Sequence, residues 1–417
     1  MLLLKRILSI FILFFSFSTQ AVSTNLKDSF ECEWDNKNGV PCLIINKHIP
    51  NTSQISADGI KRYVITAQDI DESGATDVNE VLEMIPGISL SQSGPMGQQT
   101  SLFSRGTGSN HTLVLLNGVP INDQSTTQGL HDFGVDFIQT IHQVEVYPGS
   151  NGSHFGPNAI GGAVNFITTG DFKNGFEISG INDKNNVSKG NYTLITNNNW
   201  TLNLKAGFVN SETDSAIQGG SEKDGTKNLS GNFNAEKWIN DNIKFRANAY
   251  SRKTVSEYDS SSVVEENYKG DNFMYAAQFG FDHIKKDLKD YITFHFHQYD
   301  REYNEGGVID DYLSNAFFTR SERKFKLNDK LSLGFGGEYK YDWGEFENRG
   351  SYNASTKGNT YNTGIFSNIG FKPLKNTTLS FFGRSDIHKT TGLNNTHKIN
   401  VTQNFKKIKV GIAHSTG

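Results

Sequence analysis

The feature that most constrains this chain is a two-residue hydrophobic period through residues 171–417. Leu202, Leu204, Ala206 and Phe208 alternate with polar or small residues, and Leu331–Trp343 repeats the pattern over a length that soluble domains rarely need. Similar runs occur at 243–249, 273–281, 292–296, 365–371, 379–387 and 399–405. The period predicts long antiparallel strands. Membrane β-barrels and soluble β-sandwiches both contain such strands, so the period alone leaves both open.

The connections between these strands favour the barrel. Tight polar turns are expected at 240–242, 285–289, 328–330 and 373–376. Longer polar loops are expected between them, at 211–228, 254–271, 301–319 and 344–358. Outer-membrane barrels alternate tight periplasmic turns with long external loops in this way. Aromatic residues near strand ends are candidates for the interfacial girdles of such a barrel, namely Trp238, Tyr250, Tyr299 and Trp343.

The strand count predicts an incomplete barrel. The pattern gives roughly thirteen strands, whereas single-chain bacterial barrels close with an even number. The last expected strand, 408–414, has no return strand before Gly417. An open edge in lipid would leave backbone groups unpaired at several kcal/mol each. We therefore expect a truncated chain that holds about 13 of the roughly 22 strands of plugged transporters.

Composition agrees with a strand-rich, wet-lumen protein. Only 35% of the residues are hydrophobic, yet the chain has 30 Phe, 15 Tyr and 41 Gly. This balance disfavours both a disordered chain and an enzyme with large buried cores. A net charge of −4 gives no reason to expect nucleic acid as a partner.

The first residues predict export. Lys5 and Arg6 precede an apolar run at 7–17 that is too short to span a bilayer, and Ala21 offers a cleavage site, so residues 1–21 are expected to be a signal peptide. No later apolar run approaches the roughly 20 residues of a membrane helix. Residues 22–61 form a polar extension that holds the only cysteines, Cys32 and Cys42. In an oxidising periplasm a disulfide is the simplest interpretation; a metal pair is the alternative.

Residues 62–170 contain blocks with recognisable patterns. Arg62–Glu72 is expected to be a strand that leads into a helix, and Ala75–Pro86 an amphipathic helix that Pro86 ends. Ser104–Thr107 and Leu113–Asp123 follow, and Val144–Thr169 forms the last block. In this order and spacing the blocks resemble the plug domain of TonB-dependent outer-membrane receptors, most of all the cobalamin receptors. The resemblance implies an α+β plug domain (62–170) followed by an antiparallel transmembrane β-barrel (171–417).

The resemblance also assigns plug-motif residues. Arg105 is expected to pair with carboxylates of the barrel wall, and Asn117-Gly118 to form a hairpin turn. The other motif residues are Gly106, Gly149, Gly156, Gly161, Gly162 and Asn165. The chain departs from the usual Gly-Pro-x-Ser-x-x-Tyr-Gly at 149–156, so a remodelled turn is expected there. No convincing TonB box is found: Val64–Ala67 has a suitable composition but matches the first plug strand, so the box is expected within 22–61.

The function implied by the resemblance is active uptake of a scarce ligand, most simply cobalamin or another corrinoid. The plug loops at 93–100 and 123–129 should face outward and carry the ligand contacts: Ser93, Met96, Gln98, Gln99, Asn122 and Gln124. A ferric-siderophore receptor is the alternative, and an outer-membrane enzyme is the alternative from another class. The enzyme is disfavoured because the chain has no nucleophile elbow, no H-E-x-x-H and no P-loop.

Cofactors and partners follow from the same resemblance. No cofactor or metal site is expected, although Asp224, Asp259 and Asp271 are candidates for calcium in external loops. His295 and His297 share a strand face and are a candidate metal pair, but a polar lumen wall explains them more simply. The implied partners are the TonB–ExbB–ExbD complex and outer-membrane lipid. A monomer in the outer membrane of a Gram-negative bacterium is expected.

Overall fold

The computed structural model describes nine stretches of the chain, all within one compact unit, His48–Gly417. They are residues 53–55, 61–170, 175–182, 185–195, 199–214, 223–259, 268–350, 353–405 and 409–416. The expected signal peptide, both cysteines and most of residues 22–61, the region expected to hold the TonB box, lie outside them. Among the described residues, no helix has the length and apolar character needed to cross a membrane.

The first part is a small α+β domain built on a six-stranded sheet in the order β1-β2-β7-β8-β5-β6. Only the β5–β8 pair is parallel, and β3 and β4 form a separate hairpin. The helices are α2, α3 and α4, and short 3-10 turns complete the connections. The bounds are β1 Ser53–Ile55, β2 Lys61–Thr66, α2 Ala67–Ser73, α3 Val78–Glu83, β3 Ile88–Gln92, β4 Thr100–Ser104, β5 Thr112–Leu116, β6 Val119–Pro120, β7 Gln143–Pro148, α4 Gly152–Phe155 and β8 Gly162–Ile167.

Local sequence explains these elements. Thr66 caps α2 in a capping box with Asp69, and Gly74 ends the helix in the left-handed conformation with φ 69°. Asp77 caps α3 by accepting a hydrogen bond from the backbone N–H of Glu80. The predicted helix at Ala75–Pro86 is therefore shorter than expected, because Asp77 is its N-cap and Pro86 lies beyond its end.

The domain has an apolar core between its helices and its sheet. Val78, Val81 and Leu82 of α3 are fully buried against Val114 and Val144 of the sheet. Four side chains of the second part that face the small domain join the same cluster: Tyr250, Met274, Ala276 and Tyr299. The core is thus centred in the small domain and touches its neighbour through only a few side chains.

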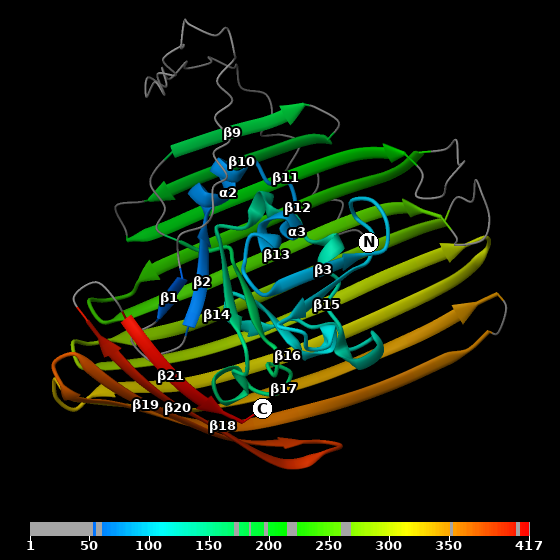
Figure 1. The fold of residues 1–417 in the computed structure, drawn as a ribbon. Helices are drawn as coiled ribbons and strands as arrows, with labels where there is room; N and C mark the ends of the chain where they lie inside the picture. The colour runs from blue at the N-terminus through cyan, green and yellow to red at the C-terminus, as the bar shows by residue number, and fades with distance from the viewer. Residues whose placement is uncertain are drawn as a thin grey trace, which may run out of the picture. The chain divides into compact units, whose positions relative to one another are not determined.

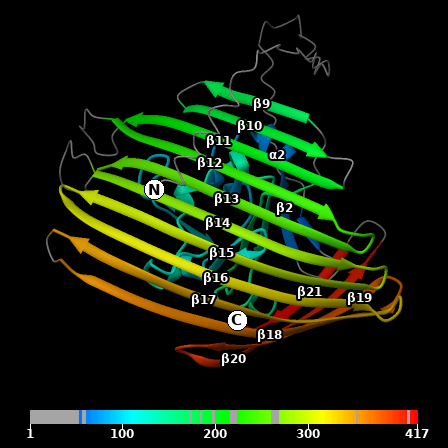
Figure 2. The ribbon, with the colours of Figure 1, turned by 180° about the vertical axis from the view of Figure 1, so that it is seen from behind.

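The second part is one 13-stranded antiparallel sheet in strict sequence order, β9 to β21. Figure 1 shows the sheet curving behind the small domain, and Figure 2 shows its outer face. The bounds are β9 Gly175–Asn182, β10 Asn185–Ile195, β11 Trp200–Asp214, β12 Lys223–Trp238, β13 Ile243–Tyr258, β14 Tyr268–Ile284, β15 Leu288–Glu305, β16 Val308–Lys326, β17 Leu331–Arg349, β18 Ser355–Leu374, β19 Thr377–His388, β20 Gly392–Asn404 and β21 Lys409–Ser415. This confirms the predicted strand number and strand direction. Within the described residues no pairing joins β9 to β21.

The strands are longer, and some connections shorter, than the sequence predicts. The expected long loop at 301–319 is wrong: β15 and β16 run through it to a turn at Gly306 and Gly307, which adopt φ 61° and 93°. The connection expected at 344–358 shrinks to 350–354. At about 3.4 Å per residue, the 20 residues of β18 span roughly 65 Å, far more than an apolar band of about 25 Å requires. Most of the polar residues at 301–319 and 344–358 therefore lie in paired strand ends rather than in loops.

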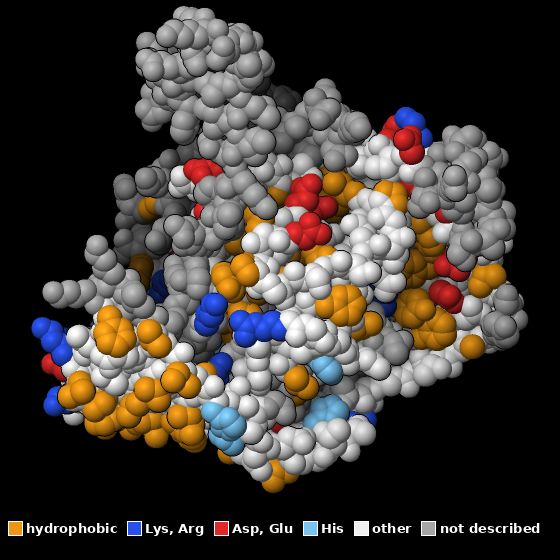
Figure 3. All heavy atoms as spheres, viewed as in Figure 1, with side chains coloured by type: hydrophobic (Ala, Val, Ile, Leu, Met, Phe, Trp, Pro, Cys, Tyr) orange, Lys and Arg blue, Asp and Glu red, His pale blue; other side chains and the backbone are white. Residues whose placement is uncertain are grey.

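The two faces of the sheet differ. Residues that point toward the small domain are buried and mostly polar, such as Asn232, Asn234 and Asn248. The opposite face exposes Phe233, Phe279 and Phe381, among many apolar residues. Figure 3 shows hydrophobic side chains gathered over the region of β19–β21. Trp238 and Trp343 lie exposed as expected of a girdle, whereas Tyr250 and Tyr299 do not, because their strand positions point toward the small domain.

Candidate functional site

Two loops of the small domain meet one end of the sheet, which we call the apex end; the opposite end, with the connections at 239–242, 285–287, 327–330 and 375–376, is the turn end. The backbone oxygen of Met96 accepts a hydrogen bond from Thr226 Oγ1 at 2.6 Å, and that of Gly97 accepts one from Ser256 Oγ at 2.9 Å. The second loop begins at Asp123, which reaches β15. Both loops thus contact the sheet at its apex end.

The structure divides the predicted ligand residues. Ser93 and Gln99 are exposed, and Met96 and Gln124 are half-buried. Gln98 is buried, and its Nε2 donates to the backbone oxygen of Glu257 at 2.6 Å. Asn122 is also buried, and its side-chain amide bonds only to the domain's own backbone at Thr112, Val114 and Gly129. Asn122 therefore does not lie at the loop surface, because it ties the loop to β5.

Beside these loops the sheet presents a group of aromatic rings that sequence reasoning did not single out. We call it the apex aromatic cluster: Tyr258, Tyr268, Tyr303, Tyr312 and Phe346. Ring centroids lie 5.8 Å apart for Tyr258 and Tyr268, 6.0 Å for Tyr303 and Tyr312, and 4.8 Å for Tyr312 and Phe346. All five are half-buried. The signal in the sequence was their position at alternate, inward-facing sites near strand ends, which becomes visible only once the strand lengths are known.

Gly270 shows that the cluster is continuous across three strands. A Cβ atom at Gly270 would meet the ring of Tyr303 at 3.1 Å and the ring of Tyr258 at 3.9 Å. The two rings therefore lie over the same stretch of β14 backbone. Because Gly270 has no side chain, the rings of Tyr258 and Tyr303 can both lie close to this part of β14.

Arg301 connects the apex aromatic cluster to the small domain. Its guanidinium carbon lies 4.6 Å from the ring centroid of Tyr312, a cation–π geometry. Its Nε lies 2.9 Å from Asp123 Oδ2, and its Nη2 donates to Ser125 Oγ at 3.0 Å. Arg301 and Asp123 are both buried. Arg301 thus links the apex aromatic cluster to a loop of the small domain.

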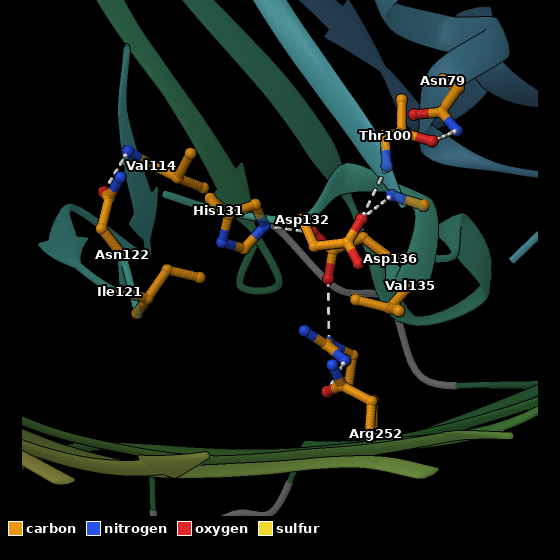
Figure 4. A network of polar contacts seen from close by, with 12 residues as sticks. Asn79, Thr100, Val114, Ile121, Asn122, His131, Asp132, Val135, Asp136 and Arg252 are labelled. Carbon is orange, nitrogen blue, oxygen red and sulfur yellow. Dashed lines mark hydrogen bonds and ion pairs between the residues drawn. The ribbon is translucent and has the colours of Figure 1, made fainter. Parts of the chain in front are cut away.

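A second buried ion pair lies deeper, between Arg252 of β13 and Asp136 (Figure 4). Arg252 Nε lies 2.9 Å from Asp136 Oδ1, and His131 Nε2 lies 2.5 Å from Asp136 Oδ2. Arg252 Nη1 also donates to Asn272 Oδ1 at 2.9 Å. The carboxylate of the small domain is therefore held from both sides.

Electrostatics distinguish Asp136 from its neighbour Asp132. Burial alone would raise the pKa of Asp136, but His131 and Arg252 outweigh it and hold that pKa below its usual range. Burial raises the pKa of Asp132, although the backbone N–H groups of Thr100 and Gly134 donate to its carboxylate. Their surroundings thus shift the pKa values of the two carboxyl groups in opposite directions.

The motif residues are largely structural in their placement. Asn117 and Gly118 form the tight turn between β5 and β6 with φ 50° and 83°, as predicted. Asn165 Oδ1 accepts from the backbone N–H of Gly118. Positive φ also occurs at Gly106, Gly149, Gly156 and Gly162, and a Cβ at Gly161 would collide with Thr107.

Arg105 differs from its prediction. It has φ 52° and is exposed, and no ion pair of the described residues includes it. Its backbone N–H donates a hydrogen bond to the backbone oxygen of Gly87. Its side chain lies over Gly87 and Gly149. Ion pairs do join the small domain to the 13-stranded sheet, but with the opposite polarity. Carboxylates of the small domain pair with arginines of the sheet.

The metal candidates gain no support. His295 and His297 share a face and are fully buried, with 3.2 Å between His295 Nε2 and His297 Nδ1. Asp271 forms an ion pair with Lys253 at 2.8 Å. Within the described part of the chain, no group of three or more His, Cys, Asp or Glu side chains is arranged to hold a metal ion.

Comparison with known proteins identifies the small domain. Residues 55–163 match the model of the TonB-dependent Receptor Plug Domain. This range covers the elements from β2 to the start of β8 together with both apex loops. We refer to this domain below as the plug and to the 13-stranded sheet as the wall.

Solved structures with the same fold include receptors for iron chelates. The siderophore receptor PirA from Acinetobacter baumannii superposes with a TM-score of 0.69 at 17% identity, over 84% of this chain and 60% of that one. The ferric yersiniabactin uptake receptor FyuA from Yersinia pestis gives 0.66 at 15% identity, over 87% and 61%. A mutant of the ferric enterobactin receptor PfeA from Pseudomonas aeruginosa gives 0.67 at 15% identity, over 84% and 61%.

At these identities the likeness establishes the fold. The chain spans about 60% of the length of these receptors. It joins a domain that matches the TonB-dependent Receptor Plug Domain to an antiparallel sheet that resembles the barrel of the matched receptors.

Proposed function

We propose that this chain takes part in TonB-dependent uptake of an iron(III)–siderophore complex across the outer membrane of a Gram-negative bacterium. The observation that carries the proposal is the apex aromatic cluster, which lies next to the plug loops and is bonded to them through Arg301. Catecholate and phenolate chelators are flat and aromatic, and such groups stack well on tyrosine and phenylalanine rings. Iron chelates of this kind are commonly anionic, which suits the neighbouring Arg301.

Arg301 supplies the positive charge on the face of the sheet that carries the cluster. Arg349 of β17 lies three residues beyond Phe346 and therefore points to the opposite face, where it pairs with Glu302 and Asp311. The proposal therefore assigns the ligand contact to the aromatic rings, with buried Arg301 holding them in place.

Ligand binding and plug movement are coupled in this proposal. A ligand that changes the positions of Tyr303 or Tyr312 acts on Arg301, and through it on Asp123 and Ser125 of the plug. The TonB–ExbB–ExbD complex would pull on the segment N-terminal to β2, within residues 22–61. This is a coupling between two sites on one chain, and it requires no covalent chemistry. We propose that the chain acts as a monomer in contact with outer-membrane lipid.

Cobalamin is the second candidate, favoured by the polar, uncharged apex residues Ser93 and Gln99, both exposed. Amide and hydroxyl groups of this kind suit the corrin side-chain amides, which offer neutral hydrogen-bond donors and acceptors. The apex aromatic cluster has no equivalent reason to face a corrinoid.

A binding comparison tests the proposal. The chain in detergent is titrated with an iron(III)–tricatecholate, an iron(III)–trihydroxamate and cobalamin. We expect the catecholate to bind most tightly and Tyr312→Ala to weaken it about tenfold, the order of one lost aromatic contact. Tyr361→Ala is the matched control, since Tyr361 lies exposed on the outer face of β18. Tighter binding of cobalamin than of either chelate, unaffected by Tyr312→Ala, would contradict the proposal.

A further inference from the structure

A group of lysines surrounds a cavity at the turn end of β14–β18, opposite the plug loops. We call it the lysine cluster: Lys286, Lys289, Lys324, Lys326, Lys330 and Lys372. The cavity measures about 440 Å³. Its lining includes these six lysines but only two carboxylates, Asp287 and Asp329. The chain as a whole carries a net charge of −4, so this excess of positive charge is local.

Few of these lysines have a carboxylate partner. Lys324 Nζ lies 3.1 Å from Glu322, and Lys326 Nζ lies 2.5 Å from Asp329. Within the described residues no ion pair includes Lys286, Lys289, Lys330 or Lys372. The lysines lie at the turn-end termini of β14 to β18, in three sections of chain: 286–289, 324–330 and 372. Residues distant in sequence therefore bring like charges to one place.

The strand register makes the arrangement unfavourable by itself. Lys289 and Lys324 lie directly opposite each other in the β15–β16 ladder, so their side chains share one face. Like charges at directly opposed positions destabilise an antiparallel pair. Lys324 alternates with Glu322 and Arg320 along β16, and Arg320 pairs with Glu338 on the plug-facing side. The opposed lysines thus point to the inner side of the wall, where the cavity lies.

We propose that the lysine cluster binds a compact polyanion, and that during uptake this polyanion is the iron chelate as it leaves the plug–wall space. An anion of charge −2 or more would remove the repulsion between Lys289 and Lys324 and give the unpaired lysines a partner. A concave surface with an excess of one sign of charge raises the local concentration of counter-ions. The identity of the natural anion rests on the proposed function; the existence of the anion site does not.

Lysine rather than arginine suits such a site. An ammonium group on a flexible stem acts as a point charge and sets little demand on the shape of its partner, whereas arginine favours fixed bidentate geometry. A release site benefits from weak, shape-tolerant binding, because cargo must leave again. Recognition of shape would be left to the apex aromatic cluster, and the lysine cluster would supply charge alone.

The test uses pyrophosphate as a probe, titrated calorimetrically into the full chain in non-ionic detergent. The fourfold variant Lys289→Gln, Lys324→Gln, Lys330→Gln and Lys372→Gln should weaken binding at least tenfold. The charge-matched control replaces four lysines at the apex half, Lys227→Gln, Lys253→Gln, Lys269→Gln and Lys357→Gln, and should bind as the wild type does. Binding should weaken as salt is raised. Equal affinity of the wild type and the first variant would overturn the anion site.

Competition separates the possible anions. Iron(III)–citrate should displace pyrophosphate from the wild type. Displacement by phosphatidylglycerol vesicles but not by the iron chelate would overturn the cargo assignment in favour of a lipid phosphate. The proposed function fails independently, through loss of siderophore binding at the apex aromatic cluster, which pyrophosphate does not report.

Discussion

The interior of the plug is formed mainly by aliphatic side chains, whereas its contact with the wall is formed mainly by polar ones. Inside the plug, Val78, Val81 and Leu82 are completely buried among other aliphatic side chains. At the contact, Asn234 Nδ2 of the wall donates to the backbone oxygen of Thr168 at 3.0 Å, and other amides and hydroxyls do the same along its length. The wall adds a few apolar side chains to this contact, namely Tyr250, Met274, Ala276, Tyr299, Val209 and Phe382.

The difference indicates which boundary can open. Separating an apolar core exposes its whole area to water at roughly 25 cal/mol per Å². Separating a hydrogen-bonded contact exchanges protein partners for water, with a net cost of about 0.5–1.5 kcal/mol for each bond. The plug–wall contact is therefore suited to rearrangement while the plug core stays folded. The two buried ion pairs are the exception, since a buried charge that loses its partner remains costly.

Arg252→Met should have the largest effect on the contact. It leaves the carboxylate of Asp136 buried beside His131 without its guanidinium, and breaking a buried pair in this way costs about 3–5 kcal/mol. We expect a lower urea midpoint for exposure of the plug to pulse proteolysis. The double variant Asp136→Asn/Arg252→Met should recover most of the loss, because no charge is then left unpaired. A single variant as stable as the wild type would show that the contact does not depend on this pair.

Leu82→Ala should destabilise the plug interior by about 2–5 kcal/mol, the range for a buried leucine that leaves a cavity. Hydrogen exchange should then increase in α3, β7 and β5. The hydrogen-bonded contact at Thr226, Thr254 and Ser256 should keep its protection as long as the plug stays folded. Equal loss of protection in both regions would mean that core and contact form one cooperative unit.

Asp77 should make plug stability depend on pH, by about 1–3 kcal/mol in total. Burial raises the pKa of Asp77 from 3.8 to about 6. Between these two values the folded plug keeps a proton on Asp77 that the unfolded chain has lost. The contribution of Asp77 to the free energy of unfolding is therefore greatest below pH 3.8 and falls as pH rises through about 6. Asp77→Asn keeps the helix cap and should remove this part of the pH dependence. Urea midpoints measured at pH 4, 5, 6 and 7 check it; an unchanged slope in the variant would exclude Asp77 as the source.

The sequence predicted the architecture because strand period and plug motifs are local signals. Alternation at 202–208 and 331–343 was sufficient to predict antiparallel strands, and Asn117-Gly118 was sufficient to predict its turn. Strand lengths were underestimated because the polar residues at 301–319 have the composition of a loop, yet pair in a ladder from Glu305↔Val308 onward. The polar composition of a segment indicates that it is exposed to water. Whether the segment pairs in a sheet depends on its partner strand, which the local sequence does not describe.

The candidate site was harder to predict for the same reason. The apex loops could be located, but Gln98 and Asn122 are used for internal hydrogen bonds that only the fold creates. The apex aromatic cluster gathers side chains from five strands between Tyr258 and Phe346, and their shared face depends on register. The buried Arg252–Asp136 pair joins residues 116 positions apart, which no spacing rule would connect.

Lys253→Met should have the smallest effect, and it isolates what burial contributes. Lys253 follows Arg252 on the same strand but points to the other face, where its Nζ lies 2.8 Å from Asp271 Oδ2. The Lys253 side chain is 52% exposed, whereas that of Arg252 is 2% exposed. Each basic residue thus has an aspartate at nearly the same distance. An exposed pair is worth about 0–1 kcal/mol, so the urea midpoint should hardly move. A loss as large as that of Arg252→Met would show that distance rather than burial decides these energies. A gain in stability would instead indicate that Lys253 faces hydrocarbon, where a charge on the lipid side of a strand is costly.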